Sequence, residues 1–68
     1  MDELHLLGKK LVQCRVGADL TQEKAAELAG ITLRFYQDLE AGKKAPSYLT
    51  LRRLASAYRI KSWDQLIP

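Results

Sequence analysis

The sequence predicts an all-α fold, a compact bundle of five short helices that forms one domain over residues 1–68. Apolar residues recur every three or four positions, as on one face of a helix, and no segment alternates apolar and polar residues as a strand would. Glycine follows three of the helical segments and marks their ends. A chain of 68 residues buries a modest core, which argues against a deep catalytic pocket.

The first helix is expected from about Glu3 to Val16. Its apolar face consists of Leu4, Leu7, Leu11 and Cys14, which recur at helical spacing. Gly17 follows the last turn, and we expect it to adopt the left-handed conformation that often ends a helix. This helix therefore supplies one side of the core.

Two further helices follow in close succession. Thr21 is a favourable N-cap, residues 22–29 are strong helix formers, and Gly30 closes the segment. Thr32 is a second N-cap, for a third helix over residues 33–41. The faces of this third helix are Tyr36, Leu39 and Glu40 on one side and Leu33, Arg34, Gln37 and Asp38 on the other.

Two last helices complete the bundle. Pro46 disfavours helical geometry just before it, so a loop precedes Ser47, which caps a fourth helix that reaches Tyr58. The inward side of this helix consists of Leu51, Leu54, Ala55 and Tyr58. Ser62 and Gln65 form a capping box for a short fifth helix. The apolar residues of that helix are Trp63, Leu66 and Ile67.

The composition is that of a globular protein, with 47% hydrophobic and 28% charged residues. No apolar run approaches the roughly 18 residues that span a bilayer. The acidic start, Asp2-Glu3, is unlike a secretory signal, and a lone cysteine, Cys14, cannot form an internal disulfide. These features predict a cytoplasmic protein with no membrane partner.

No residues group as a catalytic or metal-binding site would. His5 has no second metal ligand at a useful spacing and is expected to face solvent, whereas Cys14 is expected to pack as a small hydrophobe. The sequence has no glycine-rich phosphate loop and no nucleophile next to a base. We therefore expect no metal, no cofactor and no enzymatic activity.

The positive charge is concentrated in the second half of the chain. Residues 31–61 contain seven Lys and Arg against two acids, whereas residues 1–30 contain four against five, within a net charge of +3. This asymmetry favours a polyanionic partner for the second half. The alternative is that the basic side chains only solvate helix faces.

Two short helices joined by a tight glycine turn define a helix-turn-helix unit, here at about residues 21–41. A wider pattern includes it and consists of Thr21-Gln22, Ala26, Ala29-Gly30-Ile31, Leu39-Glu40-x-Gly42-Lys43, Pro46-Ser47, Leu51 and Leu54-Ala55. This pattern resembles the Cro/phage-repressor family of DNA-binding domains, also called the XRE family, from about Leu7 to Leu66. The resemblance implies a lambda-repressor-like fold of five helices that binds double-stranded DNA.

The resemblance also implies how DNA is bound, with the third helix in the major groove and the second across the backbone. The phosphate contacts it implies are Gln22, Thr32, Lys43, Lys44 and Ser47. On the third helix, Arg34 suits guanine or a phosphate, Gln37 suits adenine, and Leu33 suits a thymine methyl or a sugar.

Acidic residues at two positions need separate interpretation. Asp38 either accepts a hydrogen bond from cytosine or supports Arg34 one helical turn earlier. Glu40 and Arg15 resemble a partly buried ion pair of the family, and we interpret this pair as structural.

The aromatic residues of the third helix leave two interpretations. Ala25 is smaller than the leucine usual in the family, and Phe35 and Tyr36 either fill the volume it leaves or, for Phe35, form an exposed patch with Leu28. An exposed patch that also includes Leu33 would favour a second function, a protein-interaction module such as an antitoxin or adaptor.

The function we predict is a bacterial or phage-encoded transcriptional regulator, a repressor-type protein that binds a palindromic operator as a homodimer. The dimer interface is expected near the end of the chain and consists of Leu49, Trp63, Leu66 and Ile67. Alternatively, Trp63 and Leu66 close the core of the monomer. Both a complete small regulator and the N-terminal domain of a longer repressor fit this sequence.

Overall fold

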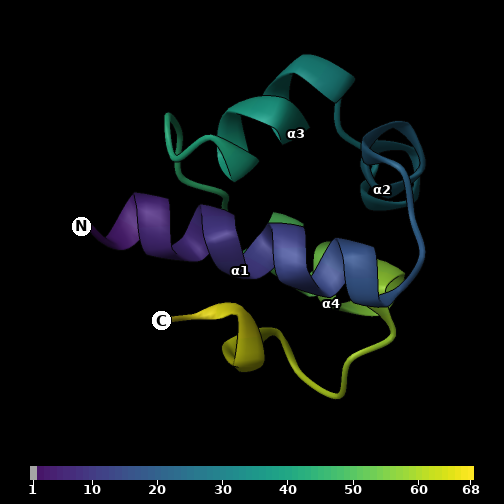
Figure 1. Cartoon of the computed structure of the whole chain (residues 1–68). Coiled ribbons are helices and arrows are strands. Elements are labelled where there is room, and N and C mark those ends of the chain that lie inside the picture. Colours follow the sequence, from purple (N-terminus) through teal and green to yellow (C-terminus); the bar gives the residue numbers. More distant parts are fainter. Residues whose placement is uncertain (1) are drawn as a thin grey trace.

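A computed structural model of the chain describes residues 2–68, so Met1 of the predicted domain lies outside them. The described part is all-helical, as predicted, with no strand among its elements (Figure 1). The elements are α1 (Glu3–Gly17), α2 (Gln22–Ala29), α3 (Leu33–Glu40), α4 (Tyr48–Tyr58) and a final 3₁₀ turn (Trp63–Leu66). The expected fifth helix is therefore a single turn.

The long helix α1 organises the bundle. It packs against α3, α4 and the final turn, and α2 packs against α3 and α4 (Figure 1). The largest side chains that are fully buried between these elements are Leu11, Tyr36, Leu39, Leu54 and Leu66. Removal of this apolar surface from water is the main source of stability in so small a domain.

The helix starts follow the predicted caps. The hydroxyl of Thr21 accepts a hydrogen bond from the amide of Lys24 at 3.0 Å, and that of Thr32 accepts one from Phe35 at 3.1 Å. Ser47 caps α4 in the same way. Each cap contributes about 1 kcal/mol by satisfying an amide that the helix leaves without a partner. The two threonines therefore fix where α2 and α3 begin.

Gly30 closes α2, as the sequence predicts, and it does so in the left-handed conformation, with φ 70°. The prediction for Gly17 is wrong, because this residue is the last of α1 and the chain reverses two residues later. Asp19 takes the left-handed conformation there, with φ 60°. Aspartate tolerates this region better than most residues, so glycine is not required.

The predicted capping box of the last turn is also wrong. The side chain of Ser62 makes no cap hydrogen bond, since the amide of Gln65 bonds to the backbone carbonyl of Ser62 at 3.2 Å instead. A 3₁₀ turn uses bonds between residues three apart, and such a bond occupies the Gln65 amide that the hydroxyl was expected to cap.

A close helix crossing lies between α1 and the end of α3. Gly8 is buried there, and a Cβ atom at this position would stand 2.9 Å from the carbonyl oxygen of Leu39 and closer still to that of Glu40. Real Cβ atoms essentially never approach backbone so closely. Gly8 therefore allows α1 to pack directly against the backbone of α3.

Ala25 belongs to the same core as the two aromatic residues of α3. Both Ala25 and Tyr36 are completely buried, and Phe35 is partly buried against the same core. Leu28 is not part of this packing and stays 49% exposed. Cys14 packs against the core, and His5 is exposed and bonded to Asp2, as expected for both.

Candidate nucleic-acid interface

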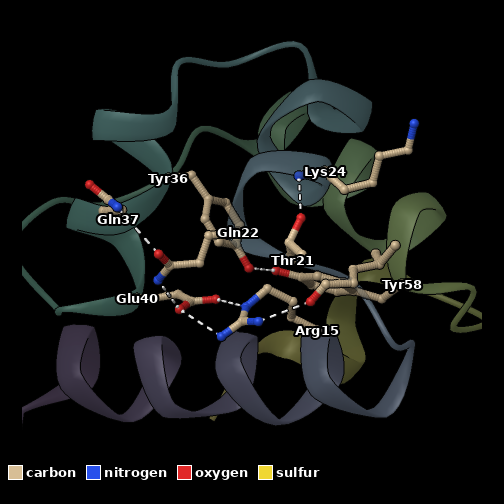
Figure 2. A network of polar contacts seen from close by, with 9 residues as sticks. Arg15, Thr21, Gln22, Lys24, Tyr36, Gln37, Glu40 and Tyr58 are labelled. Carbon is tan, nitrogen blue, oxygen red and sulfur yellow. Dashed lines mark hydrogen bonds and ion pairs between the residues drawn. The ribbon is translucent and has the colours of Figure 1, made fainter.

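The end of α3 is held by an ion pair with α1. Arg15 Nε donates to Glu40 Oε2 at 2.7 Å, and Arg15 Nη1 donates to the carbonyl of Leu20 at 2.9 Å (Figure 2). The Glu40 side chain is 6% exposed. The hydrogen bond to Glu40 raises the pKa of Arg15, so the guanidinium stays charged under all ordinary conditions. The family-like pair is thus present and largely buried.

The same carboxylate organises the start of α2. Gln22 Nε2 donates to Glu40 Oε1 at 2.8 Å, and Gln37 Nε2 donates to Gln22 Oε1 at 3.3 Å (Figure 2). Each amide nitrogen keeps one hydrogen that this chain of contacts does not use, and the Gln37 carbonyl oxygen stays available too. Gln22 and Gln37 are therefore oriented and still able to bind a partner.

The inner face of α3 is fixed by a second polar contact, which the sequence analysis missed. The hydroxyls of Tyr36 and Tyr58 form a buried hydrogen bond of 2.7 Å between α3 and α4 (Figure 2). Burial raises the pKa of both tyrosines, so both stay neutral in the folded protein. The sequence offered one indication of this bond: Tyr36 and Tyr58 both occupy inward positions, and a buried hydroxyl needs a hydrogen-bond partner.

The outer face of α3 carries Leu33, Arg34 and Gln37, which we call the reading face. All three are exposed, and the Arg34 side chain is 80% accessible. Arg34 Nε lies 3.4 Å from Asp38 Oδ1, one turn further along the helix. The reading face therefore presents an oriented guanidinium.

Asp38 does not lie on this outer face, contrary to the prediction. It is only 6% exposed, and its carboxylate is shared between Arg34 at 3.4 Å and Lys44 Nζ at 3.5 Å. The loop after α3 folds back over it, since the amide of Lys43 bonds to the Asp38 carbonyl at 2.9 Å. Of the two roles considered for Asp38, the support of Arg34 matches this geometry.

The loop that follows α3 places its polar groups unequally. Lys44 is held by Asp38 and lies 6.0 Å from the centre of the Phe35 ring. Ser47 donates its hydroxyl to Thr50 and caps α4. Lys43 is exposed and forms no salt bridge within residues 2–68. Lys43 is therefore the loop cation with the most freedom to meet an anion.

Several large apolar side chains are exposed near the C-terminus. The C-terminal patch consists of Tyr48 (57% exposed), Leu49 (51%), Ile67 (45%) and the partly buried Trp63. Trp63 stacks edge-on against Tyr48 with ring centres 5.2 Å apart. Leu66 is fully buried and closes the core, so its assignment to a dimer surface is wrong. The sequence pattern did not place Tyr48 in this patch, because Tyr48 is the first residue of α4 and is not on the face of that helix that packs into the core.

Residues 2–68 contain no group of three or more side chains that could hold a metal ion. Within the same range, no helix has the length and apolar character needed to cross a membrane.

Comparison with known proteins places this geometry in a family. A model of the helix-turn-helix family HTH_3 matches residues 11–66. An uncharacterized HTH-type transcriptional regulator of Sinorhizobium fredii, y4dJ, is 29% identical over 68 residues, which are 100% of this chain and 88% of that protein. The SPbeta prophage-derived uncharacterized HTH-type transcriptional regulator YonR of Bacillus subtilis is 33% identical over 51 residues, 75% of this chain and 47% of that protein.

Solved structures agree with the family match. The restriction-modification controller protein C.AhdI from Aeromonas hydrophila superposes with a TM-score of 0.87 and 28% identity, over 94% of this chain and 96% of that one. The clp gene regulator ClgR from C. glutamicum has a TM-score of 0.85 over 97% of this chain and 86% of that one, and at 24% identity it supports the fold alone. The chain therefore belongs to the XRE-type helix-turn-helix family (HTH_3) of DNA-binding transcriptional regulators.

Proposed function

We propose that this chain is a sequence-specific regulator that places α3 in the major groove of an operator. The observation that carries this proposal is the exposed reading face on a helix held from three sides. Glu40 ties α3 to α1 and α2, and the Tyr36–Tyr58 bond ties it to α4. Base reading requires donors and acceptors in fixed positions, which such anchoring supplies. We propose that the chain acts by binding and not by catalysis. We also propose that residues 1–68 form one domain and that the protein acts in the cytoplasm.

The reading face would supply the base contacts. Arg34 is proposed to bind guanine O6 and N7 with its two terminal nitrogens, since Asp38 faces its Nε. Gln37 is proposed to read adenine with its free carbonyl oxygen and remaining N–H, and Leu33 to touch a thymine methyl. Asp38 then acts on DNA only through Arg34.

The backbone contacts would flank the reading face. Gln22 and Thr32 lie at the starts of α2 and α3, where helix amides and side chains together favour a phosphate. The loop would add Lys43, Lys44 and Ser47 on the other side of α3. Because Lys44 is partly neutralised by Asp38, Lys43 is proposed as the stronger phosphate contact.

The C-terminal patch is proposed as the homodimer interface. Its apolar side chains, Tyr48, Leu49 and Ile67, are about half exposed in the monomer. Few side chains of one subunit reach base edges, so a second subunit is needed for useful specificity. A two-fold dimer would require a palindromic operator with half-sites about one helical turn apart.

Two substitutions separate base reading from backbone contact. Arg34→Ala should weaken binding to the preferred site by about 1–3 kcal/mol and relax the preference at one base pair. Lys43→Ala should weaken binding to all sequences alike and reduce the salt dependence of log K by about one unit. Fluorescence anisotropy with preferred and mixed duplexes, over a series of salt concentrations, measures both effects.

The same titration tests the alternative of a protein-interaction module, which the exposed Leu28 favours. DNA binding predicts that wild-type affinity for mixed duplexes falls steeply with salt. No detectable binding at low salt would favour the interaction module. If both variants lose affinity equally on every sequence, the assignment of Arg34 to base reading is wrong.

A further inference from the structure

A shallow hollow lies where the C-terminal parts of α2 and α4 meet. Its volume is about 280 Å³, and its lining consists of Leu28, Arg53, Ser56, Ala57 and Arg59. None of these residues belongs to the reading face, the proposed phosphate contacts or the C-terminal patch. On α4 the hollow begins at Arg53. The proposed DNA contact Ser47 and the proposed dimer contacts Tyr48 and Leu49 lie at the other end of this helix.

Two arginines give the hollow a positive rim. Arg53 and Arg59 are exposed, and neither forms a salt bridge within the part of the chain that the structure describes. By contrast, Arg15 and Arg34 each face a carboxylate. The rim therefore has two cationic groups available for an external acid.

The backbone at the rim is strained. Arg59 adopts the left-handed conformation, with φ 60°, where a helix more often ends in glycine. A residue with a side chain is less stable than glycine in this conformation. Arg59 therefore keeps a cationic side chain at the edge of the hollow, at a position where glycine would leave no charge.

The wall opposite is apolar. Leu28 is 49% exposed and lies on the hollow, so a carbon surface is flanked by two guanidinium groups. The hollow is smaller than the roughly 300–1,000 Å³ of sites that enclose a small molecule. Its size suits one protruding side chain of another protein.

We propose that this hollow docks an acidic segment of a partner protein. One apolar side chain of the partner packs on Leu28, and carboxylates beside it pair with Arg53 and Arg59. The charge complementarity selects an acidic partner, and DNA binding stays free because no residue of α3 or of the loop after it lines the hollow. The proposal goes beyond DNA recognition, because it lets the regulator contact a protein while it occupies its operator.

The test is an amide NMR titration of the ¹⁵N-labelled chain with a capped synthetic peptide that has leucine between two aspartates and two glutamates. We expect shifts at Leu28, Ser56 and Ala57. A peptide with serine in place of leucine should cause weaker shifts. Each exposed ion pair contributes up to about 1 kcal/mol, so Arg53→Gln or Arg59→Gln should weaken peptide binding about two- to fivefold.

A charge-matched control separates local contact from net charge. The double variant Arg53→Glu/Arg59→Glu should abolish the shifts, whereas Lys9→Glu/Lys10→Glu, with the same change of charge on exposed positions of α1, should retain them. The two double variants should have equal affinity for mixed DNA. This titration contains no DNA, so its outcome is independent of the proposed operator binding.

Three results would overturn the proposal. The first is the absence of amide shifts, or shifts confined to α3 and the loop after it. Shifts of the latter kind would show that the acidic peptide binds at the DNA site in place of DNA. The second is the same shift pattern with inorganic phosphate alone. The third is peptide binding that survives loss of both arginines while the melting temperature falls. That result would assign Arg53 and Arg59 to the C-terminal dipoles of α2 and α4.

Discussion

Replacing Gly8 by alanine should destabilise the domain by about 3 kcal/mol or more. The added Cβ would collide with the backbone carbonyls of Leu39 and Glu40, and backbone in the middle of a packed crossing cannot move aside as a flexible side chain can. α1 and α3 would have to separate, which opens the core. In a domain of this size the melting temperature should fall by about 12 °C or more, measured by circular dichroism.

Gly17→Ala is the matched control. Gly17 lies in the same helix, and a Cβ atom there would meet nothing within 4 Å. Alanine is the better helix former by about 1 kcal/mol, so this variant should be as stable as the wild type or more stable. Equal stability of the Gly8→Ala and Gly17→Ala variants would show that the crossing between α1 and α3 is looser than described.

Replacing Glu40 by alanine should cost about 3–5 kcal/mol, because it leaves the partly buried charge of Arg15 without a partner. The same change releases Gln22, so DNA affinity should fall at temperatures where the variant remains folded. Urea denaturation measures the first effect, and anisotropy with a preferred duplex measures the second.

Glu27→Ala provides the comparison for Glu40. Glu27 pairs with Lys24 at 3.5 Å on the surface, and its loss should cost less than about 1 kcal/mol. Arg15→Met/Glu40→Leu should recover part of the stability that Glu40→Ala loses, since it removes both charges together. An unchanged unfolding curve for Glu40→Ala would contradict the structural role of the pair.

Apart from the Arg15–Glu40 pair, which came from the family resemblance, the features predicted from the sequence are those that local chemistry determines. Thr21, Thr32 and Ser47 cap the helices that they precede, and Gly30 takes the left-handed conformation at the turn. Each of these outcomes depends on residues within one helical turn of its position. Such signals are readable along the chain, and together with the apolar periodicity they determine the order of the helices.

The predictions for Gly17 and Ser62 failed on local backbone geometry, but the other features that were missed depend on contacts between distant segments. The need for glycine at position 8 arises from the carbonyls of α3, and the Tyr36–Tyr58 bond joins residues 22 positions apart. The side of Asp38 was mispredicted because the loop carrying Lys44 folds over it. Leu66 shares an apolar cluster with exposed neighbours, and only the final turn's packing buries it. The spacing of residues along the sequence does not indicate which distant segments come into contact in the folded protein.

Selection of bound duplexes from a random pool tests the central claim most directly, that α3 reads a palindromic operator. We predict one enriched palindrome whose half-sites lie about 10–10.5 base pairs apart, centre to centre. Each half-site should hold a guanine whose enrichment disappears when the selection is repeated with the Arg34→Ala variant. Failure to enrich any sequence, or enrichment of the same site by that variant, would contradict the account.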